Sequence, residues 1–513
     1  MNQPTRRSFM QGATLSVLAA GSVARISRAA EVQPAEYLVG QVVDQPPLRM
    51  SDFKLREPFG WHVAGLPPAG QDGKVIIQWP ADPNETRPAR MRLCLMDTRE
   101  SRKLIEATLA KSGALLGQFD VRCAAQFQLY EIKLSADQAK AARREGVLLR
   151  QIEGKNNVWF LTGSAGDSGG PDVPDALHPH LLYDAPTDPM REYFKRMNSL
   201  ASIQNFGWME GCVLDGLRDL SQLADHAEMR RGLNAHLDLF FKPDGRLVAE
   251  TSRMQPMDDR LNTIEATGPI AALAWERPDH AALDLAIKFW RSRNDDEDCV
   301  IDGGYTTTEG AYTIGYPMAV IARQRDDKQL AEWALKQVVV RQRRLFDGKM
   351  LQRVGRRKKD GSIDHAEPGW CRGTAWQMIG LARTCRALGD MVDTSEARRG
   401  LADLARWVAP YQLPGGLWSV FVDKPELTPD TAGSSGIAAS IAIGINQGWV
   451  DPALREVPRK TLAGAKAHLT PDGYLGGGAQ SNKGGRALQV SDYRVLYPMG
   501  MGLMAQLYAA LQA

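Results

Sequence analysis

The chain has 513 residues, 43% of them hydrophobic, and is therefore long enough to bury two separate cores. Its 63 basic and 60 acidic side chains leave a formal net charge of +3, which provides no field that would favour nucleic acid or a membrane surface. The six cysteines have neither zinc-site nor disulfide-framework spacing, so we expect no metal, no cofactor and no disulfide scaffold. The one strongly basic run, RVGRRKKDG at residues 353–361, is interpreted as a solvated loop.

The first 30 residues have the features of an export signal. Arg6 and Arg7 precede Phe9 and a weakly apolar stretch, and small residues follow at Ala29 and Ala30. The stretch is too short and too weakly apolar for a membrane-spanning helix, and the whole pattern is typical of a twin-arginine signal peptide. We therefore expect a protein that is exported to the periplasm or beyond.

Residues 40–163 are predicted to form a small β-sandwich-like domain. Short β-rich runs (VIIQW, MRLCLM, QFQLYEIKL, VLLRQI and NVWFLTG) alternate with turn residues, and one polar helix is expected near residues 99–111. The stretch SAGDSGGPDVPD, residues 164–175, has the composition of a linker. The domain that follows, residues 176–513, is predicted to be helical.

Two kinds of helix alternate in residues 176–513. Five amphipathic segments begin near residues 226, 279, 326, 393 and 451, and more uniformly apolar, Gly- and Ala-rich segments lie between them. A further helix near residues 189–204 brings the number to twelve, and related turns (KPDGRL, FDGKML, LPGGLW, TPDGYL) recur after the amphipathic helices. This pattern predicts six helical hairpins that close into an (α/α)6 barrel, with an open solenoid as the alternative.

In such a barrel the first turns of the inner helices meet at one rim and line a pocket. The residues at these positions are aromatic and acidic with one arginine, a combination suited to binding sugars. They are Trp208, Glu210, Asn262, Glu265, Tyr305, Glu309, Trp370, Arg372, Trp376, Asp430, Ser434, Ser435, Asp492 and Tyr493.

The stretch WCRGTAW, residues 370–376, is the most distinctive part of this set. Arg372 and Trp376 are four residues apart and share one helical face. An arginine in a first turn, together with free backbone N–H groups, makes a receptor for a carboxylate, and a tryptophan ring offers a flat surface to a sugar. The stretch therefore predicts an acidic sugar as ligand. The alternative is that Arg372 forms an internal salt bridge to Asp492 or another neighbour while both tryptophans simply pack.

Trp370, Arg372, Gly373 and Trp376 resemble the W-x-R-G-x-x-W signature of the unsaturated uronyl and rhamnogalacturonyl hydrolases, glycoside hydrolase families 88 and 105. Trp208-x-x-Gly211, the stretch at 430–451 and the pair Asp492-Tyr493 resemble further family motifs in the same order, so the likeness spans roughly residues 186–513. It implies a six-hairpin barrel and oligosaccharide substrates that end in a 4,5-unsaturated uronic acid. The family reaction that it implies is protonation of the enol-ether double bond by a carboxylic acid, followed by addition of water.

The resemblance also implies residue roles. Glu309 stands at the position of the catalytic aspartate and would donate the proton and then act as base toward water. Arg372 would hold the uronate, and Trp208, Trp370 and Trp376 would form aromatic walls.

Several positions depart from the family pattern. The second acidic position falls near Asn262 and Thr263, which leaves Glu265 as the nearest carboxyl group, and the family's histidine is replaced by Gln352 or His365 at best. Thr306 to Glu309 also fits a capping box.

Two other functions stay open on the sequence alone. A saturated β-glucuronide could be cleaved by a carboxylate pair such as Glu309 with Glu265 or Glu210. A non-catalytic protein that binds acidic glycans would use the same receptor. The preferred interpretation is an exported glycoside hydrolase that removes a terminal uronic acid from an acidic oligosaccharide. The β-rich domain is expected to brace the barrel, to extend the substrate rim or to mediate a homodimer.

Overall fold

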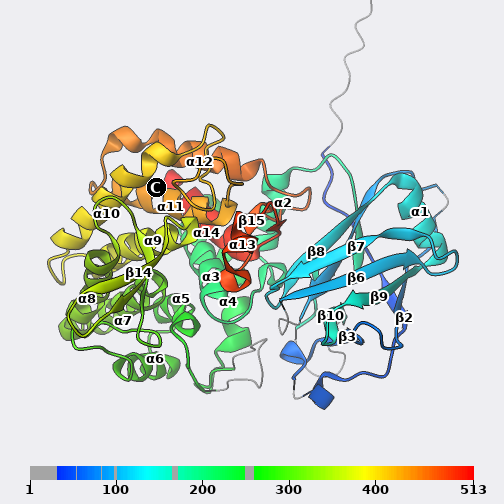
Figure 1. The fold of residues 1–513 in the computed structure, drawn as a ribbon, viewed down its shortest axis with the longest axis horizontal. Helices are drawn as coiled ribbons and strands as arrows, with labels where there is room; N and C mark the ends of the chain where they lie inside the picture. Colours follow the sequence, from blue (N-terminus) through cyan, green and yellow to red (C-terminus); the bar gives the residue numbers. More distant parts are fainter. Residues whose placement is uncertain (1–31, 54, 83, 97–100, 164–170, 249–258) are drawn as a thin grey trace, which may run out of the picture.

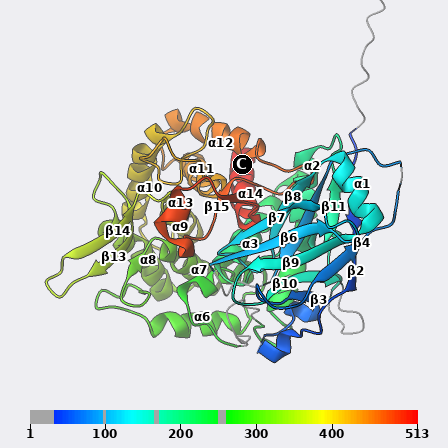
Figure 2. The same cartoon turned by 45° about the vertical axis from the view of Figure 1, so that its right-hand side comes forward.

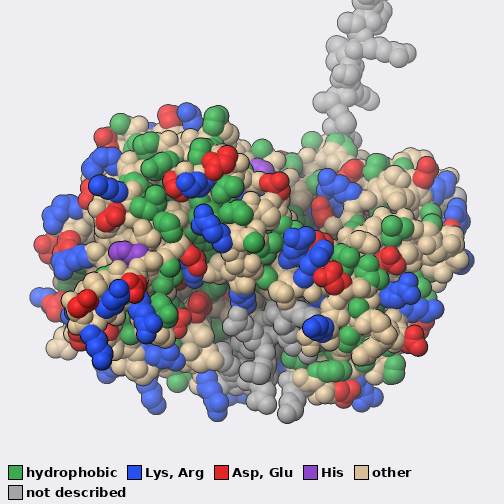
Figure 3. Space-filling view, viewed as in Figure 1, with side chains coloured by type: hydrophobic (Ala, Val, Ile, Leu, Met, Phe, Trp, Pro, Cys, Tyr) green, Lys and Arg blue, Asp and Glu red, His purple; other side chains and the backbone are tan. Residues whose placement is uncertain are grey.

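The computed structural model describes residues 32–513 except 54, 83, 97–100, 164–170 and 249–258. A β-rich part and a larger helical part lie side by side (Figure 1). The predicted export signal falls outside the described residues. Among the helices that are described, none combines the length and the apolar character needed to span a membrane. Figure 3 shows basic and acidic side chains interspersed over one face, as expected from the small net charge.

The β-rich part consists of two antiparallel sheets. The first has the strand order β1–β11–β5–β10–β3, with β8 also paired to β5, and the second has the order β2–β4–β9–β6–β7. The strands are β1 Tyr37–Val39, β2 Gln41–Asp44, β3 His62–Leu66, β4 Val75–Gln78, β5 Ala89–Leu95, β6 Arg102–Leu109, β7 Leu115–Arg122, β8 Gln128–Leu134, β9 Val147–Glu153, β10 Val158–Gly163 and β11 His180–Tyr183.

The five strands predicted from β-rich runs are confirmed as β4, β5, β8, β9 and β10. The helix predicted near residues 99–111 is wrong, because β6 occupies most of that stretch and buries every second side chain, from Lys103 to Leu109. A helix does occur later, at α1 (Ala136–Glu145), where Ser135 and Gln138 form a capping box. β11 pairs with β1 and β5, so the first sheet includes a strand that lies beyond the expected domain end at residue 163.

The helical part contains the twelve predicted helices. The amphipathic ones are α2 Pro189–Met197, α4 Met229–Phe240, α6 Ala282–Arg291, α8 Lys328–Leu345, α10 Ser395–Val408 and α12 Glu456–Lys466. The apolar ones are α3 Trp208–Ser221, α5 Ile270–Glu276, α7 Tyr316–Arg325, α9 Cys371–Leu388, α11 Thr431–Asn446 and α14 Pro498–Gln512. In α9 every residue except Arg386 is buried, which is what an inner helix requires.

The inner helices form a closed ring. Each of α3, α5, α7, α9, α11 and α14 packs on the next, and α14 packs on α3. The closing contact depends on glycine, because a Cβ atom on Gly502 would lie 2.2 Å from the carbonyl oxygen of Cys212. An open solenoid has no such contact between its first and last units.

Short strands and one short helix lie at the rim where the inner helices begin. The strand β12 (Thr306–Thr307) pairs with β13 (Gln352–Arg357), which pairs with β14 (Ile363–Pro368). The strands β15 (Gly478–Ala479) and β16 (Arg494–Val495) form a second small sheet, and the short helix α13 (Gly485–Val490) lies between them in sequence. The basic run at 353–361 thus begins in the hairpin of β13 and β14.

The two parts lie against each other (Figure 2), and they share both polar and apolar contacts. The Arg92 guanidinium in β5 donates to the Asp472 carboxylate at 2.6 Å, and both side chains are fully buried. The Tyr37 hydroxyl donates to the same carboxylate at 2.7 Å. The rings of Phe59 and Phe240 meet edge to face at 5.5 Å, within one continuous core. The β-rich part therefore braces the helical ring.

Candidate active site

An aromatic wall crosses the rim at which the inner helices begin. Trp208 is the first residue of α3, and its ring meets that of Trp376 in α9 edge to face at 5.3 Å. The Trp376 ring in turn stacks on Tyr312 at 5.6 Å. Trp376 is almost fully buried and Trp208 is partly exposed, so the wall leads from the surface into the ring.

Glu309 lies at this rim and carries a close ionic partner. Its Oε1 atom is 2.6 Å from both Nε and Nη2 of Arg353 in β13, and its Oε2 atom accepts from the Thr308 hydroxyl at 3.2 Å. The Thr306 hydroxyl instead accepts from Arg344 at 3.0 Å, so these contacts do not make the capping box considered from the sequence. Two nitrogens of one guanidinium therefore contact a single oxygen of Glu309, which makes this a short, charge-assisted contact.

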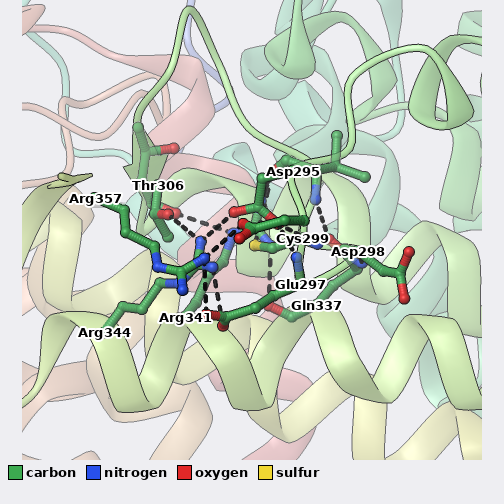
Figure 4. Close-up of polar contacts among 12 residues, drawn as sticks. Asp295, Glu297, Asp298, Cys299, Thr306, Gln337, Arg341, Arg344 and Arg357 are labelled. Atoms are coloured by element: carbon green, nitrogen blue, oxygen red, sulfur yellow. Dashed lines mark hydrogen bonds and ion pairs between the residues drawn. The ribbon is translucent and has the colours of Figure 1, made fainter. Parts of the chain in front are cut away.

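The chain leading to Glu309 is fixed by two arginines of α8 (Figure 4). The buried Arg341 donates from Nε to the Thr307 carbonyl at 3.1 Å and from Nη1 to the Gln337 carbonyl at 2.9 Å. Arg344 bonds the Thr306 hydroxyl and the Asp295 carboxylate, the latter at 2.6 Å. The strand β12 therefore has little freedom to move, and Glu309 follows it after one residue, Thr308.

Glu265 differs from Glu309 in its charged neighbours, which are acidic instead of basic. It lies in the short helix Ile264–Thr267, is partly exposed, and no ion pair reaches it from any described residue. Burial raises the pKa of Glu265, and the negative charges of Glu309 and Asp302 raise it further. Glu265 is thus close enough to Glu309 to feel its charge.

Arg372 is in the first turn of α9 as predicted, but it is 1% exposed and bonded to the protein itself. Its Nε atom lies 3.2 Å from Oδ2 of Asp430, and its Nη2 atom donates to the Gln480 carbonyl. The internal salt bridge considered as the alternative is therefore present, with Asp430 rather than Asp492 as partner.

Trp370 contacts an arginine from each of the two ion pairs described above, Arg372 with Asp430 and Arg353 with Glu309. The Arg372 guanidinium lies 4.9 Å and the Arg353 guanidinium 5.1 Å from the Trp370 ring centre. Glu309, Arg353, Trp370, Arg372 and Asp430 consequently form one row of contacting side chains. Arg372 and Glu309 are at the same end of the ring, as the sugar-site interpretation requires.

The segment from Gly478 to Val490, called the cover segment below, closes over this row. Besides the Gln480 carbonyl on Arg372, its Gln489 side chain accepts from the Trp370 indole N–H at 3.1 Å. With its amide oxygen turned toward Arg353, Asn482 accepts from that guanidinium at 2.9 and 3.0 Å.

The cover segment also contacts the β-rich part, because Gln480 donates to the Gln128 side chain in β8 at 3.0 Å. Figure 1 shows α13 and β15 on the side of the ring that faces the sheets. The β-rich part therefore borders the rim of the candidate site as well as bracing the ring.

Other predicted residues belong to the framework. Glu210 is fully buried, accepts from the Gln204 amide at 2.8 Å and contacts His236 at 2.7 Å, so it does not pair with Arg372. Ser434 is also fully buried and accepts from the Trp418 amide at 2.9 Å. The Ser435 hydroxyl donates to the carbonyl of Thr431 at 2.8 Å within α11.

The remaining predicted residues lie nearer the surface. Asn262 and Tyr305 are exposed, and the Tyr305 ring lies under the Arg356 guanidinium. Asp492 is exposed and accepts from the Thr428 hydroxyl. The Tyr493 hydroxyl donates to the Asp120 carbonyl at 2.7 Å, so this residue contacts β7 instead of the aromatic wall.

Arg353 is the main residue that the sequence analysis missed. It begins the basic run interpreted as a solvated loop, yet only 16% of its side chain is exposed and it pairs with Glu309 and, at 3.0 Å, with Glu367. The neighbouring candidates are placed differently, because Gln352 pairs with Pro368 in the hairpin and His365 contacts the Arg344 carbonyl. The position of Arg353 directly after a predicted turn was the one available signal.

The described residues contain no cluster of three or more His, Cys, Asp or Glu side chains suited to a metal ion. A helical ring with an aromatic wall and two nearby carboxyl groups at one rim is the arrangement of a glycoside hydrolase, and the protein is an enzyme of this class. The sequence model of Glycosyl Hydrolase Family 88 matches residues 187–509, and the chain belongs to this family.

Solved structures support the same fold. A possible member of the GH105 family from Salmonella enterica is 16% identical with a TM-score of 0.52, and the match covers 63% of this chain and 93% of that one. A family 105 glycoside hydrolase from C. acetobutylicum is 17% identical with a TM-score of 0.51, covering 63% of this chain and 99% of that one. A comparison with curated proteins found no match.

Proposed function

We propose that the protein removes a terminal 4,5-unsaturated uronic acid from acidic oligosaccharides, in an (α/α)6 barrel, by acid-catalysed hydration of the double bond. The observation that carries this proposal is the pair Glu265 and Glu309, one carboxyl group with a raised pKa and one paired with Arg353, beside a row of guanidinium and indole groups. The closed ring of inner helices supports the barrel.

The two carboxyl groups have different roles in the proposed reaction. Glu265 donates its proton to C4 of the enol ether, which leaves an oxocarbenium ion at C5 and the ring oxygen. Glu309 accepts a proton from the water that adds to C5, and the resulting hemiketal opens and releases the next sugar. This assignment moves the proton donor from Glu309, where the sequence analysis placed it, to Glu265, because the pKa of Glu265 is raised and Glu309 is already paired with Arg353.

Arg372 and Arg353 are the groups suited to the uronate carboxylate. Besides their carboxylate partners, Arg372 bonds the Gln480 carbonyl and Arg353 bonds the Asn482 amide oxygen. Both are neutral acceptors, and a carboxylate forms a stronger, charge-assisted bond with the same donors. The substrate would therefore displace the cover segment. Gly477 lies directly before the cover segment and Gly485 lies within it, and these two glycines have φ angles of +73° and +71°.

The test is to incubate the protein with oligosaccharides produced by a polysaccharide lyase and to follow the ultraviolet absorbance of the C4–C5 double bond. The proposal predicts that the absorbance disappears, and that the product made in D2O carries one deuterium at C4. A stable absorbance with bound substrate would instead indicate a non-catalytic binding protein.

The Glu265 and Glu309 pair also fits a second candidate, hydrolysis of a saturated β-glucuronide by two carboxyl groups. Release of nitrophenol from a nitrophenyl glucuronide, with the unsaturated substrate left unchanged, would support it. Export to the periplasm or beyond remains our proposal from the motif in residues 1–30.

A further inference from the structure

A cavity of about 460 Å³ opens at the other end of the helical ring. It lies where α3, α5, α9, α11 and α14 end, whereas the candidate active site lies where these helices begin. Arg372 and Arg386 mark the two ends of α9, and their fourteen-residue separation corresponds to roughly 21 Å along the helix. The cavity is therefore separate from the active site, and its volume suits a small organic molecule better than a bare ion.

The charged side chains that line the cavity are mostly basic. The guanidinium groups of Arg218, Arg383 and Arg386 face the side-chain carboxylate of Asp219, and Ala513, with the terminal carboxylate of the chain, also lines the cavity. One oxygen of Asp219 pairs with Arg383, and the other accepts from Arg386 at 3.3 Å. Asp219 is therefore fully engaged, and Arg383 is further bonded to Gln506 and Tyr316.

Arg218 is the least satisfied of the three arginines. Its Nε atom is buried without a hydrogen-bond partner, and the carboxylate nearest to it, that of Glu276, is 4.0 Å away. Glu276 is itself bonded to Arg230 at 2.7 Å. The Arg218 guanidinium lies 4.3 Å above the Trp275 ring, which fixes its position at the cavity wall.

A purely structural role would explain arginines here differently. Carbonyl groups at helix C-termini carry partial negative charge, and arginines often cap them. Within the described part of the chain, however, neither Arg218 nor Arg386 donates to a helix carbonyl. The Nε atom of Arg218, and the donors of Arg386 other than the one on Asp219, are thus available to an acceptor that enters the cavity.

We propose that this cavity binds a small hydroxylated carboxylate, such as a sugar acid, with its carboxylate on Arg218 and Arg386. Guanidinium groups bind carboxylates with charge-assisted bonds, and the lining amides of Gln222, Asn446 and Gln447 suit hydroxyl groups. Trp275 and Tyr316 supply the apolar surface of the cavity. The inference does not depend on the proposed reaction, because it is drawn from side chains that take no part in it.

The test is calorimetric titration of the full chain with D-glucuronate, with neutral D-glucose as the comparison. Wild-type protein should bind glucuronate, and Arg218→Met and Arg386→Met should each weaken that binding at least tenfold. Arg386 is 36% exposed at its side chain, so its replacement is compatible with folding. Arg398→Met is the matched control, because Arg398 also lies over a tryptophan, Trp449, at 4.8 Å and also has a buried Nε without a partner, but it does not line the cavity.

Glucuronate could also bind at the active site, and Trp208→Ala separates the two sites. Binding that persists in Trp208→Ala and is lost in Arg386→Met supports the inference. It is overturned if wild-type protein binds no glucuronate, if glucose binds equally well, or if Arg386→Met and Arg398→Met behave alike. None of these outcomes requires the enzyme to turn over any substrate.

Discussion

The buried ion pair between the two parts of the molecule leads to a prediction about stability. Burial would raise the pKa of Asp472, but the charge of Arg92 and several hydrogen bonds outweigh it and lower that pKa from 3.8 to about 2. That difference corresponds to about 2 kcal/mol in favour of the ionised form in the folded protein. Arg92→Met leaves this carboxylate buried without its cation, which typically costs about 3 to 5 kcal/mol.

The assay is urea unfolding of wild type, Arg92→Met, Asp472→Asn and the double variant at pH 7 and pH 3. Because the folded pKa is depressed, the stabilisation is fully present above pH 4 and is lost as the pH falls from about 4 to about 2. We expect Arg92→Met to lower the free energy of unfolding at pH 7 much more than at pH 3. The double variant should be more stable than Arg92→Met, because it no longer buries an unpaired charge.

The exposed pair Arg102 and Asp120 is the matched control, with 43% and 30% of the side chains exposed, so Arg102→Met should cost less than about 1 kcal/mol. The reasoning is refuted if Arg92→Met unfolds within 1 kcal/mol of wild type at pH 7, or if its loss of stability is the same at both pH values.

Three further predictions concern the ring and its rim. Gly502→Ala should destabilise the protein by about 1 to 3 kcal/mol or more, because its Cβ would lie 2.2 Å from the Cys212 carbonyl oxygen; Gly415→Ala, with open space around it, is the thermal-unfolding control. Asp302→Asn removes one of the charges that raise the pKa of Glu265, so the alkaline limb of the pH–rate profile should move to lower pH, and an unmoved limb would argue against Glu265 as proton donor. Gln489→Ala removes the hydrogen bond from the Trp370 indole to the cover segment and a second one, within the segment, to the Gln480 carbonyl. The segment should then open more easily, so KM for the oligosaccharide should fall severalfold. An unchanged KM would mean that the segment does not open for substrate.

The helical architecture could be predicted because it depends on local patterns. The alternation of amphipathic and apolar segments distinguishes outer from inner helices, and both sets are found where they were expected. In the β-rich part, the stretch that forms β6 was predicted to be a helix. Its polar residues recur at every second position, the period of a strand, and this was not distinguished from the 3.6-residue period of a polar helix. The strand β11 was missed because its partners, β1 and β5, are far away in the sequence.

The rim positions of the site were also predictable, but the pairing of its charges was not. Helix starts placed Arg372, Glu309 and Glu265 at one rim. The partners of the first two, Asp430 and Arg353, are decided by tertiary packing over separations of tens of residues. Arg353 in particular was hidden in a basic run in which Arg356 and residues 358–361 have the exposed positions that such runs usually have. The charged partners of the two glutamates therefore followed only from the structure.

The most direct test of the account is the rate at which a 4,5-unsaturated uronide loses its ultraviolet absorbance with wild type and with Glu265→Gln. Wild type should consume the double bond, and Glu265→Gln should do so at least about 100-fold more slowly while it still binds the oligosaccharide. A Glu265→Gln variant that retains the wild-type rate, or a wild-type protein that leaves the absorbance unchanged, would contradict the proposed chemistry.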